Sequence, residues 1–129
     1  MPLRSLISSV LVWPDRKHVA SALWGWAREE ARRHPGLVRL GVFGSYSRGD
    51  WGVGSDLDLV AILHEVDVSF ERRGVSWRTE RLPVPAEILV YSQEEWDRLQ
   101  REGTRFSRTI AEETLWIYPE KSGSPQDRE

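Results

Sequence analysis

Apolar residues gather in three short runs, each bounded by polar residues, glycine or proline. Residues 37–43 and 57–63 form two runs of seven, and residues 84–91 form a third. Runs of this length between turn-forming residues predict β-strands. The second run is almost wholly apolar, which predicts a central strand buried on both faces. Pro85 lies near the start of the third run, a position typical of a strand start or an edge strand.

Between residues 16 and 33, ahead of these runs, apolar residues recur with the period of an α-helix. Apolar side chains recur there on one face and charged side chains on the other. Pro14-Asp15 provides a start signal, and Pro35-Gly36 provides a stop. We expect an amphipathic helix that covers one face of a sheet.

The last third of the chain has clear helix signals. Ser92, followed by two glutamates, is a typical N-cap, and it predicts a helix over residues 94–101 that ends at Gly103. A second short helix is expected over residues 104–113. It leads to a final strand at 115–118.

These elements predict an α/β fold with a small mixed β-sheet and helices packed mainly on one face. We expect one domain over residues 1–119 and a polar, disordered tail over 120–129. Residues 64–82 have mixed propensities, and either an interrupted helix or a hairpin fits them.

Composition narrows the functional classes. A chain of 129 residues with 40% hydrophobic and 29% charged residues is typical of one soluble domain. The net charge of −2 gives no basic excess, so nucleic acid is a disfavoured partner. The absence of cysteine excludes disulfides, thiolate zinc sites and a cysteine nucleophile. No run approaches the roughly 20 apolar residues that span a bilayer, and no signal peptide is evident, so we expect a cytoplasmic protein.

Two carboxylates flank the start of the second run. Asp56 and Asp58 stand at i and i+2, which places them on the same face of a strand, roughly 6–7 Å apart. Like charges this close repel and raise each other's pKa unless a cation lies between them. The spacing therefore predicts a hard divalent metal site, and carboxylate oxygens suit Mg²⁺.

The first run ends at Gly44-Ser45, where backbone N–H groups and a hydroxyl become free at a turn. Such a turn is typical of a phosphate cradle. Gly44 would allow the backbone to approach a phosphate closely, and Ser45 could cap a short helix while it contacts the phosphates. A phosphate cradle that faces a carboxylate pair favours metal-assisted phosphoryl or nucleotidyl transfer.

The arrangement Phe43-Gly44-Ser45, a spacer of residues 46–55, then Asp56-Leu57-Asp58-Leu59 resembles the nucleotidyltransferase superfamily that includes DNA polymerase β. More closely, Gly44-Ser45-Tyr46-Ser47-Arg48-Gly49 with Ser55-Asp56-Leu57-Asp58 resembles the minimal nucleotidyltransferases, small domains often paired with a HEPN-domain partner. The resemblance covers about residues 37–119.

The resemblance implies a third carboxylate on the neighbouring strand, just ahead of an apolar triplet. Glu87 occupies that position, where the family usually has Asp. It is either a third metal ligand or general base, or a surface residue at a strand end. Arg48 could contact triphosphate oxygens, or it could tie down the loop through Asp50.

The working hypothesis is Mg²⁺-dependent transfer of a nucleotidyl group, AMP from ATP, to an acceptor hydroxyl. Asp56 and Asp58 would hold one ion against the triphosphate, and a second ion would be shared with Glu87. The resemblance implies that the acceptor is a tyrosine on a HEPN-type toxin ribonuclease, which would make this protein the antitoxin.

Two other functions remain open. A transferase for small molecules such as antibiotics would need a wall for its substrate, and a homodimer would have to provide it. A non-catalytic module of the same fold would bind its partner by contact alone. His18, His34 and His64 share no spacing and are expected to be ordinary polar residues. We expect four tryptophans in the core or at a partner surface, namely Trp24, Trp26, Trp77 and Trp96, and base stacking remains open for Trp51.

Overall fold

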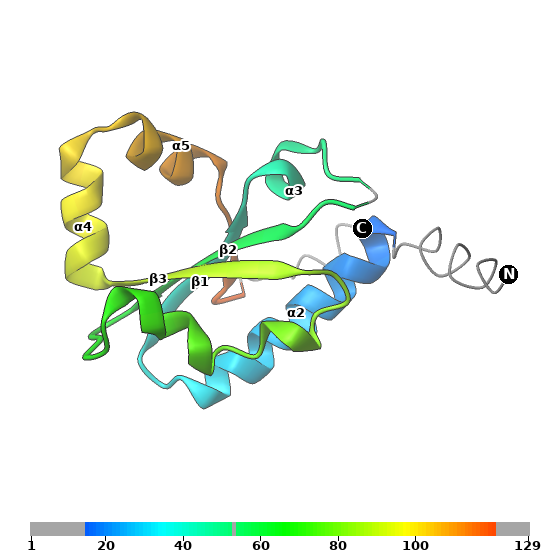
Figure 1. The fold of residues 1–129 in the computed structure, drawn as a ribbon, viewed down its shortest axis with the longest axis horizontal. Helices are drawn as coiled ribbons and strands as arrows, with labels where there is room; N and C mark the ends of the chain where they lie inside the picture. The colour runs from blue at the N-terminus through cyan, green and yellow to red at the C-terminus, as the bar shows by residue number, and fades with distance from the viewer. Residues whose placement is uncertain (1–14, 53, 121–129) are drawn as a thin grey trace, which may run out of the picture.

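The computed structural model describes residues 15–52 and 54–120 as one sheet with helices around it (Figure 1). The sheet has four strands in the order β3-β2-β1-β4. Their bounds are β1 Leu37–Phe43, β2 Leu57–Leu63, β3 Ala86–Ser92 and β4 Leu115–Tyr118. The bounds of β1, β2 and β4 agree with the apolar runs in the sequence. The third strand begins after Pro85, because proline cannot donate to the ladder.

The sheet is mixed, as the sequence predicts. β1 runs antiparallel to both β2 and β4, whereas β2 and β3 run parallel. The β2–β3 pairing continues without a shift from Leu57 opposite Ala86 to Leu63 opposite Ser92. The almost wholly apolar β2 is an inner strand, which confirms the predicted central position.

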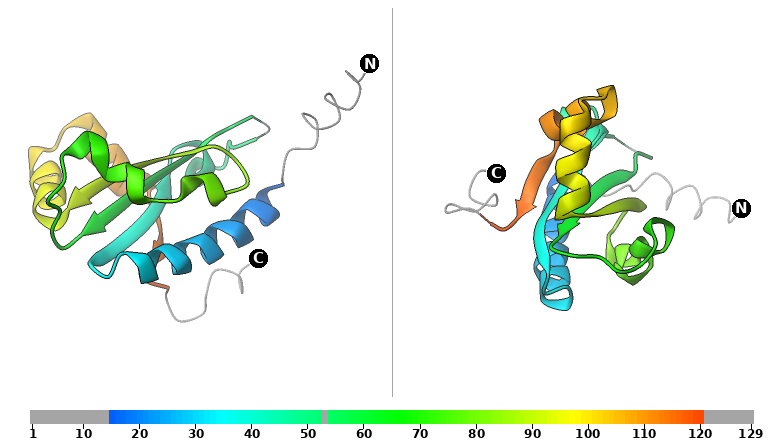
Figure 2. Two further views of the ribbon diagram at one scale, coloured as in Figure 1. Left: turned by 60° about the horizontal axis from the view of Figure 1, so that its bottom comes forward. Right: turned by 90° about the vertical axis from the view of Figure 1, so that its left-hand side faces the viewer.

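Successive residues of β2 serve two different cores, because side chains alternate across a strand. Leu57, Leu59 and Ala61 join the larger core. Helix α2, Arg16–Arg33, covers that face with Val19, Leu23 and other apolar residues (Figure 2). Val60 and Ile62 point the other way.

On that other face, helices α4 (Gln93–Glu102) and α5 (Arg105–Glu113) cover part of the sheet. Trp96 of α4 and Ile110 of α5 complete the smaller core. The predicted fold class is therefore confirmed, with the main helical cover on the α2 face.

The N-cap of α4 agrees with the sequence signal at Ser92, and α5 also begins at a side-chain cap. The Ser92 hydroxyl accepts the N–H of Glu95, and the Glu95 carboxylate accepts the N–H of Ser92, which is a complete capping box. Gly103 ends α4 with φ of 62°, a conformation that favours glycine. Thr104 caps α5 by accepting the N–H of Ser107.

The segment that the sequence left open contains two 3₁₀ helices, η1 (Phe70–Ser76) and η2 (Thr79–Arg81). It is thus an interrupted helix rather than a hairpin. Long-range contacts hold it: Arg73 forms a bidentate pair with Glu95, at 2.6 and 3.1 Å. The Trp26 indole donates to the carbonyl oxygen of Arg78 at 2.8 Å.

Trp24, Trp26, Trp77 and Trp96 are all buried, so the expected core role is confirmed for them. Within residues 15–52 and 54–120, none of the helices combines the length and the apolar character that crossing a membrane would require. The predicted disordered tail falls, from residue 121 onward, outside the described residues. So do residues 1–14.

Glu30 of α2 is the one fully buried carboxylate among the described residues. Its oxygens lie 2.8 Å from Arg33 Nη1 and 2.8 Å from Arg78 Nε. His34 Nε2 lies 3.5 Å from the same carboxylate, and its ring stacks on Trp77 with centroids 3.8 Å apart. This buried cluster ties α2 to the segment that leads into β3.

Replacing Glu30 by alanine should lower the free energy of unfolding by about 2–4 kcal/mol, because it leaves the Arg78 guanidinium without its buried partner. Urea denaturation measures the change. Glu29→Ala is the matched control: Glu29 pairs with Arg32 at the surface, and its loss should cost less than about 1 kcal/mol. Equal losses in the two variants would contradict a structural role for the buried cluster.

Candidate active site

The candidate residues meet at one end of the sheet. β1 ends at Phe43, and the one-turn helix α3, Ser45–Arg48, follows directly. β2 and β3 both begin at this end, because they are parallel to each other and β2 is antiparallel to β1. The sequence motif of residues 43–59 and the separate carboxylate of Glu87 are therefore brought together by the topology.

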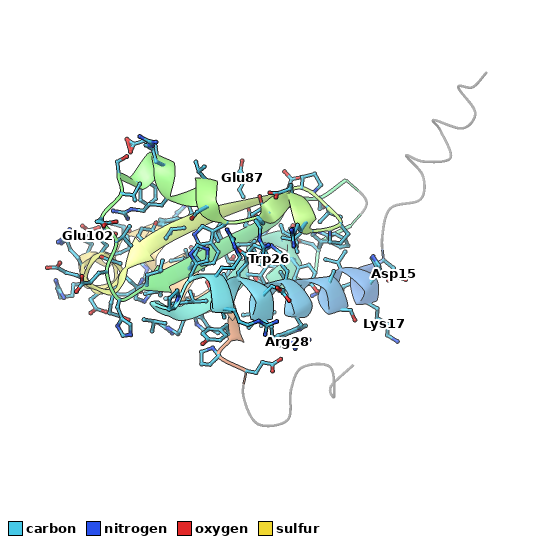
Figure 3. All side chains as sticks on the ribbon, turned by 90° about the horizontal axis from the view of Figure 1, so that it is seen from below. Asp15, Lys17, Trp26, Arg28, Glu87 and Glu102 are labelled. Carbon is cyan, nitrogen blue, oxygen red and sulfur yellow. The ribbon has the colours of Figure 1, made fainter. Side chains whose placement is uncertain are left out.

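Asp58 and Glu87 are direct neighbours across the β2–β3 ladder. Side chains alternate along a strand, so both lie on the face of the smaller core, with Val60 and Leu89 next along their strands. Glu87 projects beyond the ribbon, away from α2, in Figure 3. Asp58 is half-buried, whereas Glu87 is exposed.

Asp56 lies two residues before Asp58, in the loop just ahead of β2, and it is exposed. The i and i+2 spacing of Asp56 and Asp58 would place both on the same face of an extended strand.

Electrostatics confirm that these carboxylates act on one another. Burial raises the pKa of the Asp58 carboxyl above its ordinary value, and the negative charges of Glu87 and Asp56 raise it further. The Arg48 guanidinium acts in the opposite direction. Among the described residues, Arg48 is the one cation that lowers this pKa, whereas two neighbouring carboxylates raise it. This excess of negative charge favours the binding of a further cation.

Gly44 allows the turn to approach Asp58. Its φ of 77° lies in the region that favours glycine, and a Cβ at this position would overlap Asp58 Oδ2. The Gly44 carbonyl oxygen accepts bonds from the Arg48 N–H and the Ser47 hydroxyl. The sequence suggested that Gly44 allows a phosphate to come close to the backbone. The structure adds a second reason for glycine here, the close approach of the Asp58 carboxylate.

Ser45 does not cap a helix, contrary to expectation. Gly44 is the N-cap of α3, Ser45 is its first residue, and no side-chain capping bond is present. The Ser45 carbonyl oxygen instead accepts the N–H groups of Gly49 and Asp50, both at 3.1 Å. The prediction failed because α3 is one turn long and begins at the glycine that the close approach to Asp58 requires.

Arg48 contacts two carboxylates. Its Nε lies 3.5 Å from Asp50 Oδ2, which is the loop-tying contact that the sequence offered as an alternative. Its Nη1 lies 3.3 Å from Glu113 Oε1, at the end of α5. Sequence analysis missed Glu113. The only local signal is an acidic residue in the last turn of a helix, where a cation is normally preferred.

The donor set fits a hard divalent cation by its chemistry: three carboxylates, of which two adjoin in the sheet and one is partly desolvated. Within residues 15–52 and 54–120, no three His, Asp or Glu side chains already converge as a metal site. The Asp56, Asp58 and Glu87 side chains would have to turn toward a bound ion. Rotamer changes at exposed residues such as Asp56 and Glu87 are fast and inexpensive.

Trp51 packs beside Tyr46, with ring centroids 5.7 Å apart in an edge-on arrangement. Trp51 adjoins the larger core, on the opposite face from Asp58 and Glu87. Base stacking by Trp51 therefore has no support in its position.

Gly44→Ala should remove metal-dependent nucleotide binding and lower the free energy of unfolding by about 1–3 kcal/mol, because the new methyl group collides with the Asp58 carboxylate. Titration calorimetry and urea denaturation measure the two effects. Gly49→Ala is the control: its φ is 90°, but open space surrounds its Cβ position. If Gly49→Ala abolished binding equally, backbone strain rather than the contact with Asp58 would be the cause.

Asp58→Asn should raise the melting temperature at pH 7. A carboxyl whose pKa is raised on folding binds its proton more tightly in the folded state, so its penalty is absent at low pH and appears as pH rises through the folded-state pKa. The difference between Asp58→Asn and wild type should therefore shrink as pH falls below the ordinary pKa of 3.8. Thermal denaturation from pH 3 to 7 tests this, and a gap that widens toward low pH would contradict it.

Comparisons with known proteins bear on the family and the fold of this chain. The family model described as the nucleotidyltransferase domain matches residues 26–117. A crystal structure from Sulfolobus solfataricus, provisionally assigned as a nucleotidyltransferase, superposes with a TM-score of 0.59 at 17% identity, over 80% of this chain and 82% of that one. This likeness shows a shared fold. A search of curated proteins finds no match. On the family model, which spans most of the chain and includes all three carboxylates, this protein belongs to the nucleotidyltransferase domain family.

Proposed function

We propose that this protein transfers AMP from ATP to an acceptor hydroxyl in a Mg²⁺-dependent reaction. The observation that carries the proposal is the direct neighbourhood of Asp58 and Glu87 across two parallel strands, beside the glycine turn at Gly44. Nucleotidyl transfer requires carboxylates and a phosphate-binding turn at one place. Membership of the nucleotidyltransferase domain family supports the same chemistry.

Each residue has a role in this proposal. Asp56 and Asp58 hold Mg²⁺, with Glu87 as the third carboxylate. The turn at Gly44 and Ser45 offers backbone N–H groups and a hydroxyl to the phosphates, and Arg48 adds positive charge beside them. Bound Mg²⁺ would neutralise the charge that develops on the phosphate oxygens.

The acceptor oxygen bonds to the α-phosphorus of ATP, and the bond from that phosphorus to the oxygen bridging to the β-phosphate breaks. Pyrophosphate leaves with the electron pair. The acceptor's proton passes to the Glu87 carboxylate, whose exposure at the start of β3 leaves it open to an incoming hydroxyl.

The acceptor in this proposal is a tyrosine on a HEPN-type toxin ribonuclease. The support is the resemblance of Gly44–Gly49 and Ser55–Asp58 to the minimal nucleotidyltransferases. The exposed position of Glu87 is also compatible with an acceptor side chain that belongs to another protein. The protein would then act as an antitoxin that silences the toxin covalently.

Incubation with purified HEPN-domain ribonuclease should move label from [α-³²P]ATP, and none from [γ-³²P]ATP, onto the ribonuclease when Mg²⁺ is present. The reason is that the α-phosphorus stays with the acceptor while pyrophosphate leaves. Gel autoradiography and mass spectrometry of the tyrosine-containing peptide measure the product. The double variant Asp56→Asn with Asp58→Asn should transfer at least about 10³-fold less, because it removes the two carboxylates that are proposed to hold the catalytic Mg²⁺.

Matched controls separate chemistry from binding. Asp50→Asn removes a carboxylate of the same loop that is not assigned to the metal, and it should retain transfer. Label arriving from the γ-position would contradict nucleotidyl transfer. Inhibition of the ribonuclease without any label would instead identify a module that acts by contact.

A further inference from the structure

The Arg48 guanidinium contacts one carboxylate in its own loop and another at the distant end of α5, and we call this arrangement of Arg48, Asp50 and Glu113 the clamp. One partner, Asp50, is two residues away in the same loop, and the other, Glu113, is separated by 65 residues. Arg48 also acts electrostatically on Asp58, and its Nη1 contacts Glu113 at the end of α5. The guanidinium that is proposed to meet the triphosphate is thus already engaged by two carboxylates.

The two sides of the clamp differ in how firmly they are fixed. Arg48 ends a single helical turn between two glycines of positive φ, Gly44 and Gly49. Glu113 is fixed by packing: Ile110, one turn earlier, is fully buried, and Thr114 lies against Gly41 of β1. Glu113 is therefore held by more packing contacts than Arg48.

Glu113 is poorly placed for the stability of its own helix. It occupies the last position of α5, whose last turn contains no basic residue. A carboxylate there faces the negative end of the helix dipole, where cations are favoured. Arg48 neutralises it from outside the helix. The contact with Arg48 offsets the unfavourable interaction of Glu113 with the helix dipole.

We propose that Glu113 is a positioning residue that restrains Arg48 and thereby sets the affinity of the site for a nucleoside triphosphate. The inference rests on the nucleotide site proposed above. A bound triphosphate competes with Glu113 for the same guanidinium, so the ion pair must open, or share its cation, each time nucleotide binds. The clamp thus holds the affinity below the value that a free Arg48 would give.

Glu113→Gln should tighten the binding of Mg²⁺-ATP about two- to fivefold, the weight of one partly exposed ion pair. Titration calorimetry with full-length protein measures the dissociation constant. Glu112→Gln is the matched control: Glu112 precedes Glu113 on the same helix end, is exposed, and has no ion pair within the described part of the chain. It carries the same charge change without the contact, and its effect should be less than half as large.

A double-mutant cycle tests whether the effect passes through Arg48. Arg48→Ala alone should weaken ATP binding about tenfold, and in that background Glu113→Gln should change nothing. Glu113→Asp, which keeps the charge but shortens the reach across the 3.3 Å contact, should tighten binding as well, and it serves if the glutamine variant does not fold. Thermal denaturation of each variant shows whether a change in ATP affinity reflects a change in folding. The melting temperatures should stay close to that of wild type, because a partly exposed ion pair contributes little to stability.

The outcomes are distinct. An unchanged or weaker affinity in Glu113→Gln, with wild type binding normally, would overturn the clamp alone. Equal tightening with and without Arg48 would assign the effect to general charge and would also overturn it. If wild type shows no Mg²⁺-ATP binding at all, the proposed function and the clamp both fail.

Discussion

The parallel pairing of β2 with β3 is the constraint on which the candidate site depends. Because the register places Asp58 opposite Glu87, two carboxylates that are 29 positions apart in the numbering become neighbours on one face of the sheet. Burial of Leu57, Leu59 and Ala61 on the other face fixes that register, since a slip of one residue would turn the carboxylates into the larger core. The apolar side chains on one face of β2 thus hold the Asp58 carboxylate on the other face, near the start of the strand.

The arrangement is held against its own electrostatics. Burial and repulsion from neighbouring carboxylates oppose the charged form of Asp58. The turn at Gly44 lies so close to this carboxylate that a side chain at position 44 would collide with it. Strain of this kind is tolerated at functional sites when the surrounding structure determines the backbone. Here the surroundings are a central strand and the buried Glu30 cluster, which ties α2 to the segment ahead of β3.

The sequence predicted what local patterns control. Apolar runs bounded by glycine and proline located the strands, and Ser92 located the start of α4, because capping depends on neighbours three residues away. The 3₁₀ helices η1 and η2 escaped prediction because their anchors are distant, as in the pairing of Arg73 with Glu95. The contact of Arg48 with Glu113 spans 65 residues and left no local trace beyond an acid at a helix end. The candidate carboxylates were predictable because one motif and one strand start carry them.

A crystal structure of the protein with Mg²⁺ and a non-hydrolysable ATP analogue would test the central claim most directly. The account predicts Mg²⁺ within about 2.1 Å of oxygens from Asp56 and Asp58. It also predicts Glu87 turned toward the ion site, with the triphosphate against the turn at Gly44 and Ser45. A triphosphate bound elsewhere, or an ion held without Asp56 and Asp58, would contradict the account.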